Sequence, residues 1–204
     1  MEIIMEGMDG VGKTTIAKKL CKKYHFKYVD RPLQHLFSIG ELGSKDDIDF
    51  QNRLNKIFKE DNKIQAWITG LGDIYNAIKY KGENVIIDRG IISNYFWNWN
   101  KENELIFKTI NDLIGFPDMT IVLYASLETR LNRIRTRNIN DKDLFDSDVY
   151  RLDGYHKMAK FIKDNNIPSI FINTEGKSPD EVVTEIESKI KFKKVKKEDR
   201  EEGR

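Results

Sequence analysis

The sequence predicts an α/β fold, a single domain with a parallel sheet of about five strands and helices on both faces. Two observations lead to this prediction. Short apolar runs alternate along the 204 residues with longer segments whose apolar side chains recur at helical spacing. The first apolar run also leads into a glycine-rich segment and then a helical pattern, an arrangement typical of folds that bind phosphate at a helix N-terminus.

The first half of the chain supplies three strands and most of the long helices. The strands are short, apolar and followed by polar residues or glycine; they are Met1–Glu6, Phe26–Val29 and Asn84–Asp88. The long helices have apolar residues three and four apart; they are Thr14–Tyr24, Asp47–Glu60 and Asn62–Tyr80. Leu33–Lys45 contains two glycines and is expected to form a short helix and a loop.

The second half continues the alternation after an aromatic and polar stretch, Ile91–Asn100, to which no element is assigned. The expected strands are Met119–Tyr124 and Pro168–Asn173. The expected helices are Glu102–Ile114, Leu127–Arg137, Asp148–Asn165 and a last one that Ser178 caps and that ends near Ile190. We expect the domain to span residues 1–190, and the charged residues 191–204 to form a disordered tail.

The glycine-rich segment matches the phosphate-binding loop G-x-x-x-x-G-K-[ST]. Its glycines let successive backbone N–H groups turn toward phosphate oxygens, while Lys13 reaches the β- and γ-phosphates and the Thr14 hydroxyl ligates Mg²⁺. A simple strand-to-helix turn requires neither the lysine nor the threonine at these positions. The residues predicted to bind ATP here are Gly7, Gly10, Val11, Gly12, Lys13, Thr14 and Thr15.

Polar residues also follow the other strands, where a parallel α/β sheet binds its ligands. Asp30 and Arg31 follow the second strand, Asp88 and Arg89 follow the third, and residues 173–175 follow the fifth. Phosphoryl transfer needs positive charge around the moving group, a bound Mg²⁺ and a nearby carboxylate, and these positions offer all three. We therefore expect Thr14 and Asp88 to hold the metal.

Four arginines, at positions 130, 133, 135 and 137, lie in one predicted helix. Three of them share a helix face, which is also the pattern of a solvated stripe. The polar loop that follows, Asn138–Ser147, favours a mobile lid near residues 133–147 that closes arginines over phosphates.

With these features together, the chain resembles the thymidylate kinase family of nucleoside monophosphate kinases. The resemblance covers residues 1 to about 190 and rests on Glu6–Thr15, on Asp88-Arg89, on Pro117–Tyr124 before an arginine-rich helix, and on Arg151–Lys160. It implies Mg²⁺-dependent transfer of the γ-phosphate of ATP to a deoxynucleoside monophosphate, usually dTMP.

The resemblance also implies roles for individual residues. Asp9 would contact the acceptor, Arg31 and Arg89 would hold its phosphate, and Thr174 and Glu175 would border the adenine. The lid arginines Arg133, Arg135 and Arg137 would cover ATP, with Arg135 completing the catalytic set of Asp9, Lys13, Asp88 and Arg89. The acceptor site is further expected to include Arg151 and four aromatic residues, Phe37, Trp67, Tyr95 and Tyr155, of which Trp67 is chosen to stack on the base.

Two departures from the family pattern leave the base open. The family usually follows Asp-Arg with an aromatic residue or histidine, where this chain has Gly90, and it places an arginine in the preceding helix, where residues 64–71 have none. A deoxynucleoside kinase with Asp30 as general base, and a broad-specificity monophosphate kinase, stay as alternatives. A GTPase switch is disfavoured because Asn62-Lys63-Ile64 is followed by Gln65, not aspartate.

The composition indicates which kinds of binding partner and which cellular compartment to expect. A formal net charge of +2 indicates no general nucleic-acid-binding surface, and no apolar run is long enough to span a membrane. The start has no basic segment of a signal peptide, and the single cysteine, Cys21, is expected to be a small buried residue. We expect a cytoplasmic enzyme of small nucleotides and leave open whether it forms a homodimer.

Overall fold

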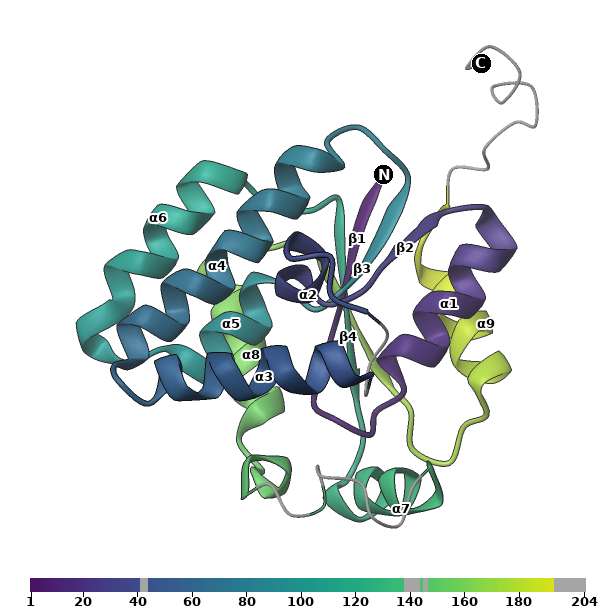
Figure 1. The fold of residues 1–204 in the computed structure, drawn as a ribbon. Helices are drawn as coiled ribbons and strands as arrows, with labels where there is room; N and C mark the ends of the chain where they lie inside the picture. Colours follow the sequence, from purple (N-terminus) through teal and green to yellow (C-terminus); the bar gives the residue numbers. More distant parts are fainter. Residues whose placement is uncertain (41–43, 138–143, 145–146, 193–204) are drawn as a thin grey trace.

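Five parallel strands form the centre of the structure, a computed structural model that describes residues 1–40, 44–137, 144 and 147–192. Their order in the sheet is β2-β3-β1-β4-β5, so the chain builds outward from β1 in both directions (Figure 1). The strands are β1 (Glu2–Glu6), β2 (Lys27–Val29), β3 (Val85–Asp88), β4 (Met119–Tyr124) and β5 (Ser169–Asn173). The predicted five-stranded parallel sheet is confirmed.

The apolar runs form the central strands because both faces of the sheet are covered. All four residues of β3 are buried, and β1 pairs with β3 on one side and with β4 on the other. In this register Ile4 lies opposite Ile87 and Thr120. The carboxyl ends of β1, β3 and β4 therefore lie at one edge of the sheet, where ligands bind in such folds.

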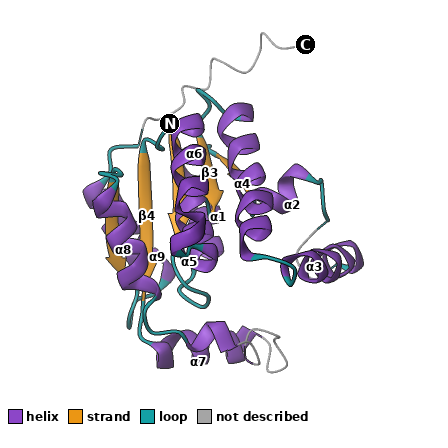
Figure 2. Cartoon of the chain, turned by 90° about the vertical axis from the view of Figure 1, so that its left-hand side faces the viewer, coloured by secondary structure: helices purple, strands orange, loops and turns teal. Residues whose placement is uncertain are grey.

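Helices cover both faces of the sheet. In Figure 1, α1 and α9 lie on one side, α4, α5, α6 and α8 lie on the other, and α7 lies beyond the carboxyl ends of the strands, as Figure 2 also shows. The helices are α1 (Lys13–Tyr24), α2 (Pro32–Leu36), α3 (Lys45–Phe58), α4 (Asn62–Lys79), α5 (Ile91–Asn98), α6 (Glu104–Ile114), α7 (Leu127–Arg137), α8 (Gly154–Asp164) and α9 (Pro179–Lys189).

Two segments differ from the sequence-based expectation. Residues 91–98, which had no assigned element, form α5, and the expected helix from Asp148 begins only at Gly154, after a 3₁₀ turn over Ser147–Tyr150. The backbone carbonyl of Arg151 accepts a hydrogen bond from the side chain of Arg130 at 3.2 Å, so it does not enter a helical ladder. Gly154 then passes close to the glycine loop, because a Cβ there would lie 2.2 Å from the sulfur of Met8.

The end of the described chain is tied to the first helix. The ring of Phe192 stacks on Tyr24 of α1, with centroids 4.2 Å apart, and meets Phe26 edge-on. The expected disorder of the tail concerns mainly residues 193–204, which lie outside the described residues. Cys21 is buried, as expected, and burial raises the pKa of its thiol to about 12. Within the described chain, no helix is both long and apolar enough to cross a membrane.

Candidate active site

The glycine loop joins β1 to α1 and requires glycine at two points. Gly7 has a φ of 137°, and a Cβ there would lie 2.3 Å from the carbonyl oxygen of Leu123 in β4. Gly10 has a φ of 83°, and a Cβ there would lie 2.6 Å from the carbonyl oxygen of Arg130 in α7. Any other residue would be strained and would clash with backbone at both positions. The loop is thus held between the central strands and α7.

Lys13 begins α1 and turns its side chain back into the loop. Its ammonium donates hydrogen bonds to the carbonyl oxygens of Gly7 and Met8, both at 2.9 Å. Burial lowers the pKa of Lys13 to about 8, and the neighbouring charge of Arg89 adds to this effect. It also lies 3.9 Å from a carboxylate oxygen of Asp9. A buried ammonium in the mouth of a glycine loop, whose two hydrogen-bond acceptors are neutral carbonyls, is suited to receive anionic oxygens.

Thr14 and Asp88 meet at the end of β3. The Thr14 hydroxyl donates a hydrogen bond of 2.5 Å to one carboxylate oxygen of Asp88, which also accepts from Tyr28 at 3.3 Å. The other carboxylate oxygen of Asp88 is buried and meets no hydrogen-bond donor in the described chain. Carboxylate and hydroxyl oxygens are ligands that Mg²⁺ prefers, and Mg²⁺ completes its shell with phosphates and water. No cluster of three or more His, Cys, Asp or Glu that could hold a metal occurs in the described residues, so the pair fits Mg²⁺ shared with phosphates better than a caged ion.

Asp9 and Arg89 form an ion pair in front of the loop. One terminal nitrogen of Arg89, Nη2, donates to Asp9, while the other, Nη1, is buried and has no partner among residues the structure describes. Burial by itself would raise the pKa of Asp9, but the charges of Arg89 and Lys13 outweigh it and lower the pKa to about 2. Asp9 is therefore ionised at neutral pH, and the N–H groups on Nη1 of Arg89 are buried without an acceptor in the described part of the chain.

Glu6, the last residue of β1, lies fully buried behind this pair. Its carboxylate accepts hydrogen bonds from the backbone N–H groups of Gly90 and Ser93, at 2.9 and 3.2 Å, and from the Ser93 hydroxyl. Burial raises the pKa of Glu6 to about 7 against the opposing effects of the Ser93 hydrogen bond and of Arg89. The carboxylate thus joins the end of β1 to the start of α5.

Arg133, Thr174 and Glu175 meet on the other side of the loop. Arg133 in α7 donates to the hydroxyl and the carbonyl oxygen of Thr174, at 2.9 and 2.6 Å, and lies 3.5 Å from the carbonyl oxygens of Gly10 and Val11. The Glu175 carboxylate accepts from the backbone and hydroxyl of Ser126, just before α7. The structure therefore brings together the predicted ATP-binding residues of the loop, α7 and the segment after β5.

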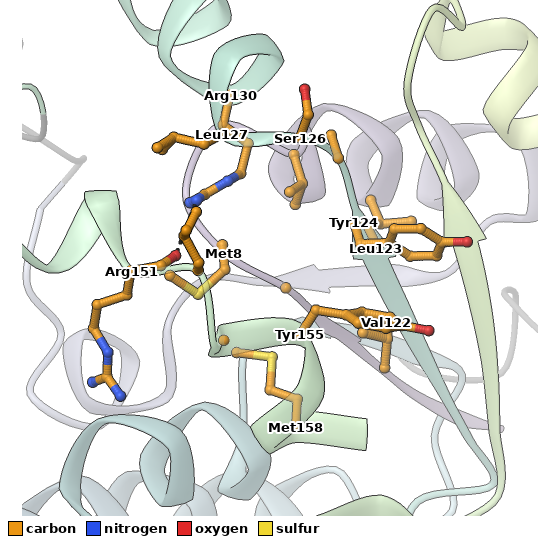
Figure 3. Close-up of a pocket in the computed structure, with 15 residues that line it drawn as sticks. Met8, Val122, Leu123, Tyr124, Ser126, Leu127, Arg130, Arg151, Tyr155 and Met158 are labelled. Atoms are coloured by element: carbon orange, nitrogen blue, oxygen red, sulfur yellow. Dashed lines mark hydrogen bonds between the residues drawn. The ribbon is translucent and has the colours of Figure 1, made fainter. Parts of the chain in front are cut away.

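A cavity of about 180 Å³ lies beside the loop, between the end of β4, α7 and α8 (Figure 3). Arg130 is 3% exposed, and its guanidinium lies close to Met8 and Arg151 in Figure 3. Of the predicted acceptor residues, Arg151 and Tyr155 line this cavity. The rest of the lining is mainly apolar and includes Leu127 and Met158.

Three predicted acceptor residues lie elsewhere. Arg31 forms an ion pair of 3.2 Å with the buried Asp47 of α3, and Phe37 is 53% exposed and packs against Phe50 of the same helix. Tyr95 stacks on Phe161 at 4.1 Å in the core, so its ring does not line the cavity.

Trp67 is 41% exposed and also lies away from the cavity and the loop contacts. It shares an exposed stripe of α4 with Ile64, Leu71 and Ile78, whose spacing of three, four and seven residues places them on one helix face. The base-stacking role expected for Trp67 gains no support from this geometry.

The lid is only partly described. Arg135 and Arg137 are exposed at the end of α7, where Arg135 donates to Asn132 of the same helix at 3.4 Å. The charge of Arg137 nevertheless contributes to the lowered pKa of Asp9. Most of the predicted lid loop, residues 138–143 and 145–146, lies outside the described residues.

Sequence reasoning missed three residues at the site. Glu6 and Ser126 stand next to ends of strands, so inspection of every strand end offers a signal for both. Arg130 was grouped with the arginines of a solvated helix face or a lid, and only the fold reveals that it is buried under the loop.

Comparisons with known proteins agree with this geometry. A family model described as an AAA domain matches residues 3–151. A probable thymidylate kinase from Methanocaldococcus jannaschii is 30% identical over 191 residues, which are 91% of this chain and 93% of that protein. A cytidylate kinase from Sulfurisphaera tokodaii is 28% identical over 94% of this chain and 96% of its own length. Among solved structures, deoxyadenosine kinase from M. mycoides with bound dCTP superposes with a TM-score of 0.60 at 18% identity, over 93% of this chain and 98% of that one, which shows a shared fold.

Proposed function

The chain belongs to the thymidylate kinase family, and from this premise we propose that it transfers the γ-phosphate of ATP to a deoxynucleoside monophosphate, with dTMP as the first candidate. The observation that carries the proposal is the pairing of two features at one edge of the sheet. The glycine loop holds the buried Lys13. Next to it, Arg89 is paired with Asp9 through one guanidinium nitrogen only. The first feature suits a triphosphate and the second a monoanionic or dianionic acceptor group.

In this proposal the donor phosphates lie in the loop. The Lys13 ammonium exchanges its two carbonyl partners for phosphate oxygens, which bear more charge. Arg133 and Thr174, already bonded to each other beside the loop, border the adenine side. The residues that would hold Mg²⁺ are Thr14 and Asp88, and the ion would neutralise charge on the phosphates when bound.

The acceptor phosphate lies against Arg89. Its Nη1 group donates to the phosphate while Nη2 stays on Asp9, so the carboxylate fixes the guanidinium in the plane that a phosphate requires. The lid arginines Arg135 and Arg137 close over the transferring phosphoryl group. Positive charges on the donor side and on the acceptor side then surround the phosphoryl group while it is transferred, as its transition state requires.

The choice of dTMP follows from the relatives, which include a thymidylate kinase and several probable thymidylate kinases, and is less well supported by the site. One relative is a cytidylate kinase, and α4 has no arginine between residues 64 and 71. A broad-specificity kinase therefore remains the second candidate. The deoxynucleoside kinase alternative needs a general base; the candidate, Asp30, has a half-exposed side chain that accepts the backbone N–H of Arg31 at 2.8 Å.

We also propose a homodimer in the cytoplasm. The exposed stripe of α4, from Ile64 through Trp67 and Leu71 to Ile78, is the kind of surface that a second copy covers. Two copies meeting along it would contact the same residues on each side.

A coupled assay of ADP release against a panel of nucleosides and deoxynucleoside monophosphates tests the function. We expect turnover with dTMP, little with thymidine, and loss of turnover when a chelator removes Mg²⁺. Arg89→Ala should lower kcat with dTMP by about 100-fold, because a charge-assisted contact to the acceptor is lost. Faster turnover of a nucleoside than of its monophosphate would overturn the assignment.

A further inference from the structure

Glu6 makes an unusual set of hydrogen bonds with the start of α5. Gly90 occupies the N-cap position of this helix and has no side chain, so the helix carries no cap of its own. The Glu6 carboxylate, reaching from β1, accepts the N–H of the N-cap residue Gly90 and the N–H of Ser93 three residues later. In a capping box these two donors are satisfied by side chains within the helix. Here one carboxylate from a different element satisfies both.

The residue held by this arrangement is Arg89. It has a φ of 75°, a left-handed conformation that costs a non-glycine residue free energy and persists only where the surroundings enforce it. Its backbone N–H donates to the carbonyl oxygen of Met5 at 2.9 Å, and the next N–H donates to Glu6. Two residues at the end of β1, Met5 and Glu6, therefore accept hydrogen bonds from the backbone N–H of the strained residue and from the N–H that follows it.

Space around the turn is limited as well. A Cβ on Gly90 would lie 3.0 Å from Ile4 Cδ1 and 3.7 Å from the Glu6 carboxylate. A side chain at position 90 would therefore crowd Ile4 of β1, whereas it would lie at ordinary contact distance from the carboxylate. The departure of Gly90 from the aromatic residue or histidine usual in the family thus avoids crowding against β1 in this chain.

We propose that Glu6 is a positioning residue that acts through Arg89, holding its backbone so that one guanidinium nitrogen meets Asp9 and the other faces the acceptor phosphate. The proposal rests on the proposed function for the identity of that anion. Glu6 touches no substrate in this arrangement. Its surroundings include the charges of Arg89 and Lys13 and the buried Asp73 of α4, whose pKa is raised by burial and by the nearby Glu6.

A double-mutant cycle tests the link to Arg89. Glu6→Gln keeps the size of the side chain but replaces one accepting oxygen with a donor, so it should lower kcat and raise KM for dTMP, together about 10- to 100-fold in kcat/KM, with KM for ATP changed less than about 2-fold. In an Arg89→Ala background the same substitution should have little further effect. An equal loss in both backgrounds would overturn the proposal, because Glu6 would then act independently of Arg89.

A second measurement does not depend on turnover. In protein labelled with ¹⁵N-arginine, the Nε–Hε signal of Arg89, assigned by its absence in Arg89→Lys, should shift in Glu6→Gln and in the milder Ser93→Ala. Thr120→Val is the matched control, since it changes a buried polar residue of the neighbouring strand β4. An unmoved Arg89 signal in folded Ser93→Ala and Glu6→Gln would overturn the positioning role. A shifted signal in an enzyme that ignores monophosphates would contradict the proposed function alone.

Discussion

The two sides of the site differ in how the chain builds them. The donor side is formed by one continuous segment, from the end of β1 through the glycine loop into α1, and Arg133 and Thr174 close around it. The acceptor side joins Arg89, at the end of β3, to Asp9 of the loop, whereas four residues expected there, Arg31, Phe37, Trp67 and Tyr95, lie elsewhere. The geometry of a contiguous motif is determined by its own residues, whereas the geometry of a surface made from distant segments depends on how whole helices pack.

The largest effect expected on the donor side is that of Lys13→Ala. The ammonium is buried against two loop carbonyls and is the cation best placed to receive donor phosphates. Its loss should lower kcat by about 1000-fold while the protein stays folded, because its role is electrostatic. Steady-state kinetics and a thermal unfolding curve measure the two properties. A variant that keeps more than about a hundredth of wild-type turnover would contradict the loop assignment.

Arg133 and Arg135 provide a matched pair within α7. Arg133→Ala should raise KM for ATP by about 10-fold, since it removes two hydrogen bonds to Thr174 beside the loop. Arg135→Ala should instead lower kcat by about 10-fold with little change in acceptor binding, as expected of a lid residue that acts after closure. The comparison uses kcat and KM for both substrates. Wild-type activity of Arg135→Ala would return this arginine to a solvated helix face.

Glu6 and Asp9, three residues apart, titrate in opposite directions. The pKa of Glu6 is raised by burial from its ordinary value of 4.5 to about 7, so the folded protein binds more protons than the unfolded chain between these values. Its contribution to stability is therefore greatest below pH 4.5 and is lost as pH rises through 7, by about 3 kcal/mol at most. Asp9, with a pKa lowered to about 2, stabilises the fold above pH 3.8 and loses this contribution as pH falls through 2.

Urea unfolding at pH 5 and pH 8 checks the Glu6 contribution. Wild type should lose more free energy of unfolding between these values than Glu6→Gln does, because glutamine does not titrate. Thr120→Val is the control, since it replaces a buried polar side chain of β4 that does not titrate and should leave the difference between pH 5 and pH 8 unchanged. Equal losses in wild type and Glu6→Gln would contradict the raised pKa.

The smallest kinetic effect is expected for Trp67→Ala, which separates the two interpretations of this residue. On the exposed stripe of α4 it should leave KM for dTMP within about 2-fold of wild type and instead weaken self-association. Analytical ultracentrifugation across a concentration series, beside the kinetics, measures both. A large rise in acceptor KM with unchanged association would restore the base-stacking role.

Sequence patterns predicted the fold well because the sheet is built from short apolar runs, which are typical of buried parallel strands. The runs at β3 and β4 are buried on both faces, and the glycine loop fixes where β1 ends and α1 begins. The helix α5 escaped prediction because its cap comes from Glu6, outside the helix, and so leaves no local signal.

The acceptor side was harder to predict for a related reason. An aromatic residue such as Tyr95 or Trp67 has the same character in the core, on a dimer face or against a base, and its spacing does not distinguish these environments. Burial of Arg130 likewise follows from the position of α7 beneath the loop rather than from its neighbours in sequence.

The close approach of Gly154 to Met8 limits which substitutions position 154 tolerates. A Cβ at position 154 would lie 2.2 Å from the Met8 sulfur and 2.8 Å from its Cγ, so the Met8 side chain occupies the space that a side chain at position 154 would need. A larger residue at position 154 requires the flexible Met8 side chain to move, or a smaller residue at position 8. A change at this one position of α8 is thereby coupled to a side chain of the glycine loop.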